Sequence, residues 1–590
     1  MAEALHALNA TAGAVARRPR HLLRLAPVLT VAAFAVPIAC GLVGTLMPAF
    51  GYLPAIGGDR WSLEPWRALR DAPGFFTSLQ LTLVVGWAST LISVLLALAV
   101  VGFLHHRAIS KRLGTFLAPL LAMPHSALAI GFAFLILPSG WMVRWISPGL
   151  TGWTIPPDVG TVGAASGWPL IAALVMKEAP FLLLMILGAL NQVRAPAQVA
   201  AARALGYGPV LAWFKVVLPQ VYPQIRLPIY AVLAFSLSVV DVAIVLGPGN
   251  PPTLAVQAVR WFSDPDTSRY FPAAAAATLL LGVVLASIGA WWLAERMARP
   301  LFRRWLERGA RGGAVAPAAG VATVAGTALA ALAVLSMLGM LLWSVARPWR
   351  FPDAFPPGLT LDTWMQQSGQ LAGPAWTTLL VGVASTALAL VLTLACLENE
   401  SRAPEPKDRS APAGSGVSAV SASVWLLYLP LLVPQVAFLF GLQVLLIRLG
   451  LDATVSAVVW AHLVFVLPYL FLSLAEPWRA FDARYARAAA SLGASPCRVF
   501  WRIKLPILLK PLLIACAVAF AVSVGQYLPT LFAGAGRVAT LTTEAVTLSG
   551  GADRRVIGTW AGLQALFPLL AYLLATLVPR LLYAHRKGLA

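Results

Sequence analysis

Apolar segments alternate with shorter polar connections along almost the whole chain of 590 residues. Each apolar segment is close to the roughly 20 residues with which an α-helix crosses the hydrocarbon core of a bilayer. The pattern predicts twelve spans, at residues 25–47, 78–104, 113–138, 168–193, 226–246, 273–295, 318–344, 374–397, 421–447, 455–475, 508–530 and 557–582. We therefore expect an all-α polytopic membrane protein.

The first apolar segment, residues 25–47, follows a basic run from Arg17 to Arg20. It is longer than the apolar core of a secretion signal, which has about 7–15 residues. This length predicts a retained membrane span and no cleaved targeting peptide.

Composition excludes several other classes of protein. Hydrophobic residues make up 59% of the chain and charged residues 11%, whereas soluble domains have roughly 25% charged residues. These proportions exclude a soluble enzyme, a small disulfide scaffold and a disordered chain.

The positive charges lie in the connections between the spans. The formal net charge is +21, and if the N-terminus is inside, the inner connections carry 30 of the 43 Lys and Arg residues. The outer connections carry 12, and Lys177 lies within the fourth span. Because Lys and Arg accumulate on the cytoplasmic side of bacterial inner-membrane proteins, both termini are expected in the cytoplasm. The same distribution explains the basic composition without nucleic acid.

The two halves of the chain repeat each other. The run from Thr82 to Thr90 returns at 378–386, an offset of 296, and Pro124 with Gly131 returns at an offset of 310. Later matches, such as Gly206 with Gly493, have an offset of 287. Each half has six predicted spans, an even number, so the two copies enter the membrane from the same side. The pattern predicts a parallel duplication.

The repeat divides the chain into three parts. Residues 1–295 form the first repeat, 296–317 a cytoplasmic linker, and 318–590 the second repeat. The change of offset places about 23 extra residues in the first repeat, around residues 141–166. A stretch rich in Ser, Pro and Ala, residues 398–423, is expected to be a flexible cytoplasmic loop.

Two cytoplasmic connections have the same unusual sequence pattern. We call residues 196–219 the first hairpin and residues 483–506 the second hairpin. In each, an alanine run favours a helix, a glycine that can adopt the left-handed conformation ends it, and a proline begins a second helix. That second helix is expected to stop at a Leu-Pro pair. The positions that carry the pattern are Ala200, Ala201, Ala202, Gly206, Leu218 and Pro219 in the first hairpin, and Arg487, Ala488, Ala489, Gly493, Leu505 and Pro506 in the second.

This spacing resembles a motif of the membrane subunits of binding-protein-dependent ABC importers. The motif is Glu-Ala-Ala, three residues, Gly, nine residues, Ile, one residue and Leu-Pro. Two copies at equivalent points of a duplicated chain are similar to the fused permeases for ferric iron, thiamine and related solutes. The segment from Gly247 to Leu254, with Asp241 before it, looks most like the thiamine-type permeases. The motif's Glu is replaced by Ala200 and Arg487, which puts in doubt the polar contacts that this Glu makes with the ATPase.

The resemblance implies a transport subunit that is not itself an enzyme. It implies two copies of a cytoplasmic ABC ATPase bound at the hairpins, a periplasmic solute-binding protein at the outer loops, and a place in the bacterial inner membrane. The sequence contains no Gly-Lys-Ser/Thr phosphate loop, so the ATPase is expected to be a separate polypeptide. The Leu548 to Gly551 segment only imitates the start of an ATPase signature.

Ionisable and polar residues inside the spans are candidates for the solute pathway, because burying them in a membrane is costly. They are Asp241, Glu178, Lys177 and Gln526. Two alternatives stay open: Asp241 could be an outer interfacial residue, and Lys177 with Glu178 could serve structural pairing. The counterpart of Asp241 at the 287 offset is Leu528.

One further motif indicates an alternative function. The segment from Gly102 to Lys111 resembles a cytoplasmic motif of major facilitator carriers, which also have twelve spans. A secondary carrier of this kind is therefore the alternative function, and a membrane scaffold without transport is a third.

The four cysteines have no metal-type spacing and are expected to be inert buried thiols. Neither a cofactor, a metal site nor a nucleophile with its base is predicted.

Overall fold

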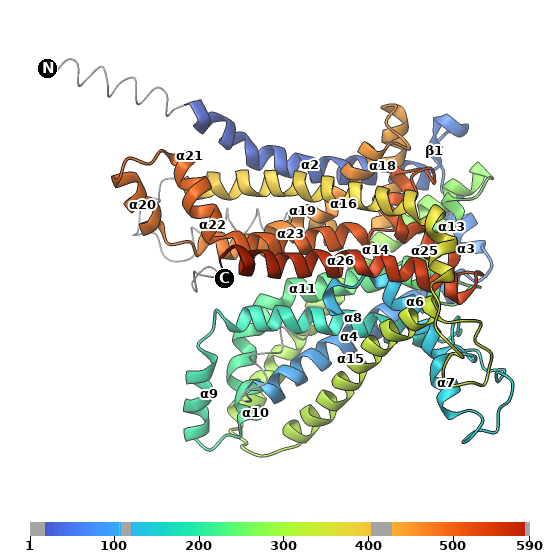
Figure 1. The fold of residues 1–590 in the computed structure, drawn as a ribbon, viewed down its shortest axis with the longest axis horizontal. Coiled ribbons are helices and arrows are strands. Elements are labelled where there is room, and N and C mark those ends of the chain that lie inside the picture. The colour runs from blue at the N-terminus through green and yellow to red at the C-terminus, as the bar shows by residue number, and fades with distance from the viewer. Residues whose placement is uncertain (1–17, 106, 108–119, 403–426, 584–590) are drawn as a thin grey trace.

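Long apolar helices run side by side in the computed structural model, which describes residues 18–105, 107, 120–402 and 427–583 (Figure 1). The first half of the chain contains α2 (Arg18–Ala49), β1 (Tyr52–Leu53), η1 (Pro54–Ile56), β2 (Gly58–Asp59), α3 (Glu64–Asp71), α4 (Phe75–Leu104), α6 (His125–Ile136), α7 (Trp141–Ile146), α8 (Trp168–Leu190), α9 (Ala195–Ala204), α10 (Pro209–Ala212), η2 (Trp213–Val217), α11 (Leu218–Ser238), α12 (Asp241–Leu246), α13 (Leu254–Phe262), η3 (Thr267–Arg269) and α14 (Tyr270–Glu307). The strands β1 and β2 form one short antiparallel pair.

The second half begins after α14. It contains α15 (Val315–Val345), α16 (Asp362–Arg402), α18 (Gln435–Arg448), α19 (Val455–Arg479), α20 (Ala483–Ser491), α21 (Pro496–Val499), η4 (Phe500–Lys504), α22 (Leu505–Ile507), α23 (Leu509–Val524), α24 (Leu528–Ala533), α25 (Leu541–Leu548) and α26 (Arg554–Leu582).

Nine helical segments of the described residues are long and apolar enough to cross a membrane, or ten if a pair bent by 75° at Leu508 counts as one span. The twelve predicted spans differ from these at the fifth, ninth and eleventh. The fifth span is divided into α11 and α12, and the eleventh into α23 and α24. The ninth is represented by α18 with 14 residues, because the chain leaves the helical residues 427–432 at Val433 and Pro434 before α18 begins. Residues 421–426 of this predicted span lie outside the described part of the chain.

The first helix of each half packs against the other half. Helix α2 lies along α18, and α15 lies along α6 and α4. Small residues allow the close approach: a Cβ at Gly44 would lie 2.8 Å from Gly441 Cα, and a Cβ at Gly131 would lie 2.5 Å from the Ser336 carbonyl oxygen. The two halves therefore form one interlocked bundle.

Matching hydrogen bonds occur at matching positions of the two halves. The hydroxyl of Thr82 on α4 accepts a bond from the Leu254 N–H at 2.9 Å, and that of Thr378 on α16 accepts one from the Leu541 N–H at 2.9 Å. Each bond ties the start of a short helix, α13 or α25, to a long helix. Thr82 and Thr378 are related by the 296 offset, and the two leucines by the 287 offset.

Both hairpins lie at the same end of the bundle as the start of α2 and the end of α26, whereas α3, α7, α13 and α25 lie at the opposite end (Figure 1). The linker predicted at residues 296–317 is mostly helical. Helix α14 continues to Glu307 and α15 begins at Val315, so only residues 308–314 are outside these helices.

The prediction of buried thiols is wrong. Cys40 and Cys497 are exposed on the surface of the chain, and Cys396 and Cys516 are partly exposed, all four as free thiols. Cys40 lies on an exposed side of α2, and Cys497 lies on the short helix α21 of the second hairpin. Apolar neighbours in the sequence do not imply burial within the protein, because a membrane helix can turn them to lipid.

Candidate coupling hairpins and solute pathway

The first hairpin is built around a left-handed glycine. Helix α9 ends in the alanine run, and Gly206 has φ +87°. The N–H of Tyr207 donates to the Ala202 carbonyl at 3.2 Å, which closes the helix end. Gly208 then has the extended conformation of an N-cap, with Pro209 as the first residue of α10. The predicted turn is confirmed.

The second hairpin has the same geometry with more side-chain capping. Gly493 has φ +80°, and the Ala494 N–H donates to the Ala489 carbonyl at 3.0 Å. The Ser495 hydroxyl accepts a bond from the N–H of Arg498 at the start of α21. Asp482 caps α20, and its pKa lies below the usual value chiefly because its carboxylate accepts the Arg484 N–H.

The expected stop at Leu-Pro is wrong for the first hairpin. The chain passes from α10 through one π-helical segment, η2, directly into α11, and Pro219 lies in the first turn of α11. The π-helical turn carries the helix past the proline: the Leu218 N–H donates to the Trp213 carbonyl, and Pro219, which has no N–H, follows directly. In the second hairpin η4 occupies the equivalent place, and the chain bends after α22.

Each hairpin is anchored to a different neighbour. In the first, the Tyr207 hydroxyl donates to the Gly309 carbonyl at 3.3 Å, and Lys215 Nζ donates to the Ala310 carbonyl at 3.1 Å. These bonds tie the first hairpin to the connection between the halves. In the second, Lys504 Nζ lies 2.8 Å from Glu398 Oε2 at the end of α16.

An apolar residue marks the tip of each hairpin. Leu205 is 64% exposed and Leu492 is 89% exposed, and they occupy equivalent positions directly before the left-handed glycine. Ala202 and Ala489 instead face inward on each side. Ala200, Ala201, Arg487 and Ala488 are exposed on the same helices. Each hairpin thus presents a smooth helix with a leucine at its end, a surface suited to a groove in a partner.

The two broken spans interrupt the bundle at equivalent points. Helix α11 ends at Ser238 and α12 begins at Asp241, while α23 ends at Val524 and α24 begins at Leu528. Asp241 therefore lies at a break inside the bundle, and the predicted counterpart Leu528 lies at the matching break. Gln526 lies in the second break, where its carbonyl accepts the Thr530 hydroxyl at 3.0 Å.

Lys177 is held by backbone carbonyls. It is 5% exposed, and its Nζ donates to the carbonyls of Leu120 at 3.1 Å, Leu121 at 2.9 Å and Met123. These carbonyls lie where the chain leaves the helical residues 120–122 and enters α6. An ammonium group has three donors, so this cap uses all of them.

We expect Lys177→Met to destabilise the fold, because it leaves these buried carbonyls without a donor. Each unsatisfied buried group costs about 1–3 kcal/mol. The measurement is the thermal unfolding temperature of the purified protein in detergent. Arg448→Met, at an exposed position at the end of α18, is the control, and equal stability of the two variants would contradict the assigned cap.

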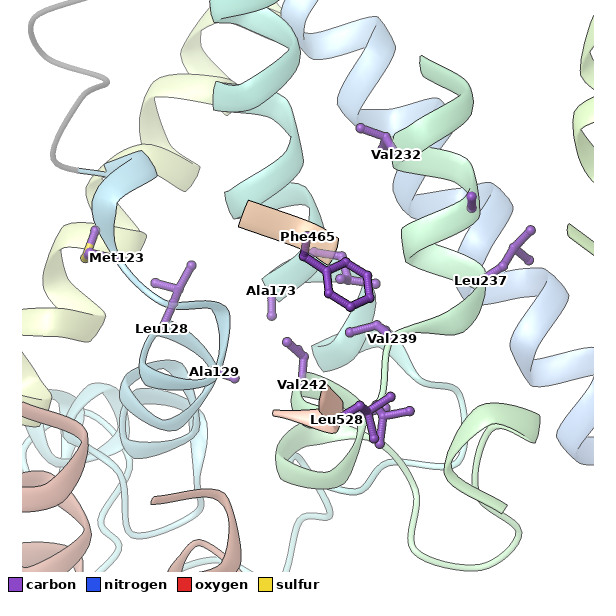
Figure 2. Close-up of a cluster of buried hydrophobic side chains, with 14 of the residues drawn as sticks. Met123, Leu128, Ala129, Ala173, Val232, Leu237, Val239, Val242, Phe465 and Leu528 are labelled. Atoms are coloured by element: carbon purple, nitrogen blue, oxygen red, sulfur yellow. The ribbon is translucent and has the colours of Figure 1, made fainter. Parts of the chain in front are cut away.

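Glu178 lies beside a histidine that belongs to a helix packed against α12. Glu178 Oε1 lies 3.4 Å from His125 Nε2, and α6, which begins at His125, packs against α12, which begins at Asp241 (Figure 2). The His125 ring lies against Phe235 on α11, with 4.9 Å between ring centroids. Sequence reasoning missed His125 as a site residue. The sequence signal for His125 is that it follows Pro124 in a repeated segment whose second copy has the uncharged Gln435 at the same place.

His462 is a second residue that the sequence pattern did not single out. It is 2% exposed on α19, and its ring nitrogens each lie 2.8 Å from a hydroxyl, Nδ1 from Ser523 and Nε2 from Thr530. Ser523 belongs to α23 and Thr530 to α24. The imidazole therefore bridges the break in the eleventh span.

Comparisons with known proteins agree with this architecture. No model of a protein family matches the chain. The chain is 32% identical over 529 residues to the inner membrane ABC transporter permease protein YnjC of Escherichia coli (strain K12), which covers 90% of this chain and 93% of that protein.

Shorter segments match other permeases. The molybdenum transport system permease protein ModB of Mycobacterium tuberculosis is 38% identical over 130 residues, 20% of this chain and 49% of that protein. The spermidine/putrescine transport system permease protein PotC of Haemophilus influenzae is 26% identical over 117 residues, 20% of this chain and 44% of that protein. With the near full-length similarity to YnjC, these matches show that the chain belongs to the family of ABC transporter permeases.

Proposed function

We propose that this chain alone forms the whole transmembrane pathway of an ATP-driven importer. Its twelve spans would be two parallel six-span repeats, residues 1–295 and 318–590, with both termini in the cytoplasm. The matching hydrogen bonds of Thr82 and Thr378 support the repeat. The observation that carries the proposal is the presence of two hairpins of equal geometry at one end of the bundle.

The partners follow from this arrangement. Two copies of a separate ABC ATPase would each receive one hairpin, and a periplasmic solute-binding protein would dock at the opposite end. ATP would draw the two ATPases together, and the hairpins would transmit this motion as a rocking of the halves, which opens the pathway to each side in turn. Because the motif's Glu is absent from both hairpins, the exposed Leu205 and Leu492 would make the main contacts with the ATPases at the hairpin tips.

The solute route would pass between the halves, beside the breaks in the fifth and eleventh spans. Asp241, Glu178 and Gln526 lie at or next to these breaks, and Lys177 would hold the neighbouring backbone in place. The segment from Gly247 to Leu254 supports a place in the branch of fused permeases that includes the thiamine type.

The membrane orientation can be tested by labelling of single cysteines in a chain without its native ones. We expect cysteines at Asp59, Asp264 and Arg537 to react with an impermeant reagent from the periplasmic side, and one at Arg308 to react only after permeabilisation. The physical reason is the excess of Lys and Arg at the hairpin end. External labelling at Arg308 would reverse the assignment.

The alternative of a major facilitator-like carrier is disfavoured by the match to an ABC permease over 90% of the chain. It makes a different prediction for energy coupling. Uptake by such a carrier would follow a proton or sodium gradient and would need no ATPase.

A further inference from the structure

The first half carries an insertion at the end of the bundle opposite the hairpins. It consists of residues 141–166, which begin with α7 and continue as an irregular segment towards α8. Helix α7 has six residues, far fewer than the roughly 20 of a membrane span. In Figure 1, α7 and the segment after it stand out to the side of the bundle, near α6 and the end of α15. The insertion therefore extends sideways, in the direction in which a membrane protein meets lipid.

The surface of this insertion is apolar. Residues 141–157, all within the described part of the chain, include a single charged residue, Arg144, which is 3% exposed. Large apolar side chains are exposed instead, namely Met142, Trp145, Ile146, Leu150, Trp153 and Ile155. Leu150 is 86% exposed and Ile155 is 75% exposed. An exposed apolar patch of this kind marks contact with a partner or with a membrane.

The patch is continuous with a surface that faces lipid. Trp141 of α7 packs against α15, where a Cβ at Gly339 would lie 3.2 Å from its ring. Helix α15 is long and apolar enough to cross a membrane, and Leu338 and Leu341, on either side of Gly339 in the sequence, are exposed on it. In a membrane permease these exposed leucines contact acyl chains. The lipid-facing surface of α15 thus leads directly to the insertion.

The kinds of side chain favour a bilayer over a soluble protein as the partner. Trp145 and Trp153 are exposed, and tryptophan is enriched where the hydrocarbon core meets the headgroups. The other exposed residues of 141–157 are aliphatic residues, methionine, glycine, proline and threonine. A protein–protein interface has a polar rim around its apolar centre, whereas none of the exposed side chains in these described residues is charged.

Arg144 fixes the insertion to the second half of the chain. Its guanidinium donates to the carbonyls of Arg350 at 2.6 Å and Asp353 at 3.2 Å. Trp141 Nε1 donates to the neighbouring Ala354 carbonyl at 3.1 Å. These carbonyls belong to the connection between α15 and α16. Whatever holds the insertion in place therefore also holds this connection of the second half.

We propose that residues 141–155 form an interfacial anchor, which lies in the headgroup region of one leaflet with its exposed apolar side chains inserted towards the acyl chains. The partner is the phospholipid surface itself. Because the anchor has no exposed charge, it binds by burial of apolar area. Through Arg144 it fixes the connection between α15 and α16 to the same membrane surface. The inference goes beyond the proposed function and depends neither on the solute nor on an ATPase.

The test measures the depth of the insertion in the full chain. Single cysteines at Leu150 and Ile155, in a chain without its native cysteines, are labelled with a nitrobenzoxadiazole fluorophore. The proteoliposomes consist of phosphatidylethanolamine and phosphatidylglycerol, with nitroxide-labelled phospholipids in both leaflets as quenchers. We expect blue-shifted emission and quenching as strong as at Leu338 on α15. A label at Thr267, exposed beside Asp266 at the same end of the bundle, should remain in water and be quenched several-fold less.

A pair of substitutions at one exposed position tests the apolar binding mode. With the label at Ile155, Leu150→Glu should reduce the quenching, because a carboxylate is costly near the acyl chains, whereas Leu150→Met should leave it unchanged. Labels at Leu150 and Ile155 that behave like the label at Thr267 overturn the inference, as does equal quenching in the two Leu150 variants. Shielding of these labels only after a solute-binding protein is added would also overturn it, because the insertion would then be a protein docking surface.

Discussion

Replacing both hairpin glycines with valine, in the double variant Gly206→Val and Gly493→Val, is expected to abolish ATP-driven uptake while the protein still inserts. Both glycines have φ near +80°, where a residue with a Cβ is disfavoured by roughly 1–2 kcal/mol and a β-branched one by more. Each turn would open, and the alanine-rich helices would leave their docking position. The measurement is uptake and ATP hydrolysis in proteoliposomes that contain the partner proteins.

The matched control replaces the same residues with asparagine, which tolerates the left-handed conformation better than other residues. A Cβ at Gly493 would meet no atom within 4 Å, whereas one at Gly206 would lie 3.3 Å from the Arg311 side chain. The single variants at position 493 therefore isolate the backbone effect. Wild-type uptake by the double valine variant would refute the coupling role of the hairpins.

The second large effect is expected at the crossing of α2 and α18. A Cβ at Gly441 on α18 would clash with the backbone oxygen of Gly41 on α2. The two helices are closely packed, so a backbone atom at this crossing cannot shift to make room. Gly441→Val should therefore separate the first helix from the second half and prevent a stable bundle. Loss of the monodisperse peak in fluorescence-detected size-exclusion chromatography measures this.

Gly282→Val is the control for that crossing, since a Cβ at Gly282 in α14 would meet no atom within 4 Å. The intrinsic helix propensity of valine is the same at both positions. A difference between the two variants therefore reports the packing at the crossing of α2 and α18. Similar chromatographic profiles for the two variants would contradict the close packing of α2 on α18.

The sequence predicted the features that local pattern determines. Hydropathy predicted most of the long helices, and the Ala-Gly-Pro order predicted the left-handed turns at Gly206 and Gly493. It did not predict the break after Ser238, because Val239 and Val240 have no helix-breaking signal. That break depends on packing against other spans.

The candidate site was predictable only in part, for a similar reason. Asp241 and Glu178 were identifiable as costly residues inside spans, but the place of His125 beside Glu178 depends on the packing of α6, α8 and α12, which are separate in the sequence. Lys177 was expected to pair with a carboxylate if it were structural, and it caps backbone carbonyls instead. Such partners become available only where a helix is interrupted, here before α6 at Pro124. The proline signals the interruption, but the sequence does not show that Lys177 on α8 packs against it.

The most direct test of the central claim is photo-cross-linking from the hairpin tips in native membranes. A photoreactive amino acid at Leu205 or at Leu492, which are exposed at equivalent positions, should cross-link to a cytoplasmic protein that mass spectrometry identifies as an ABC ATPase. The same residue at Leu150, 86% exposed outside both hairpins, should not. Cross-links to the ATPase from both tips are the result that the permease assignment predicts, and their absence from both tips in a complex active in uptake would contradict it.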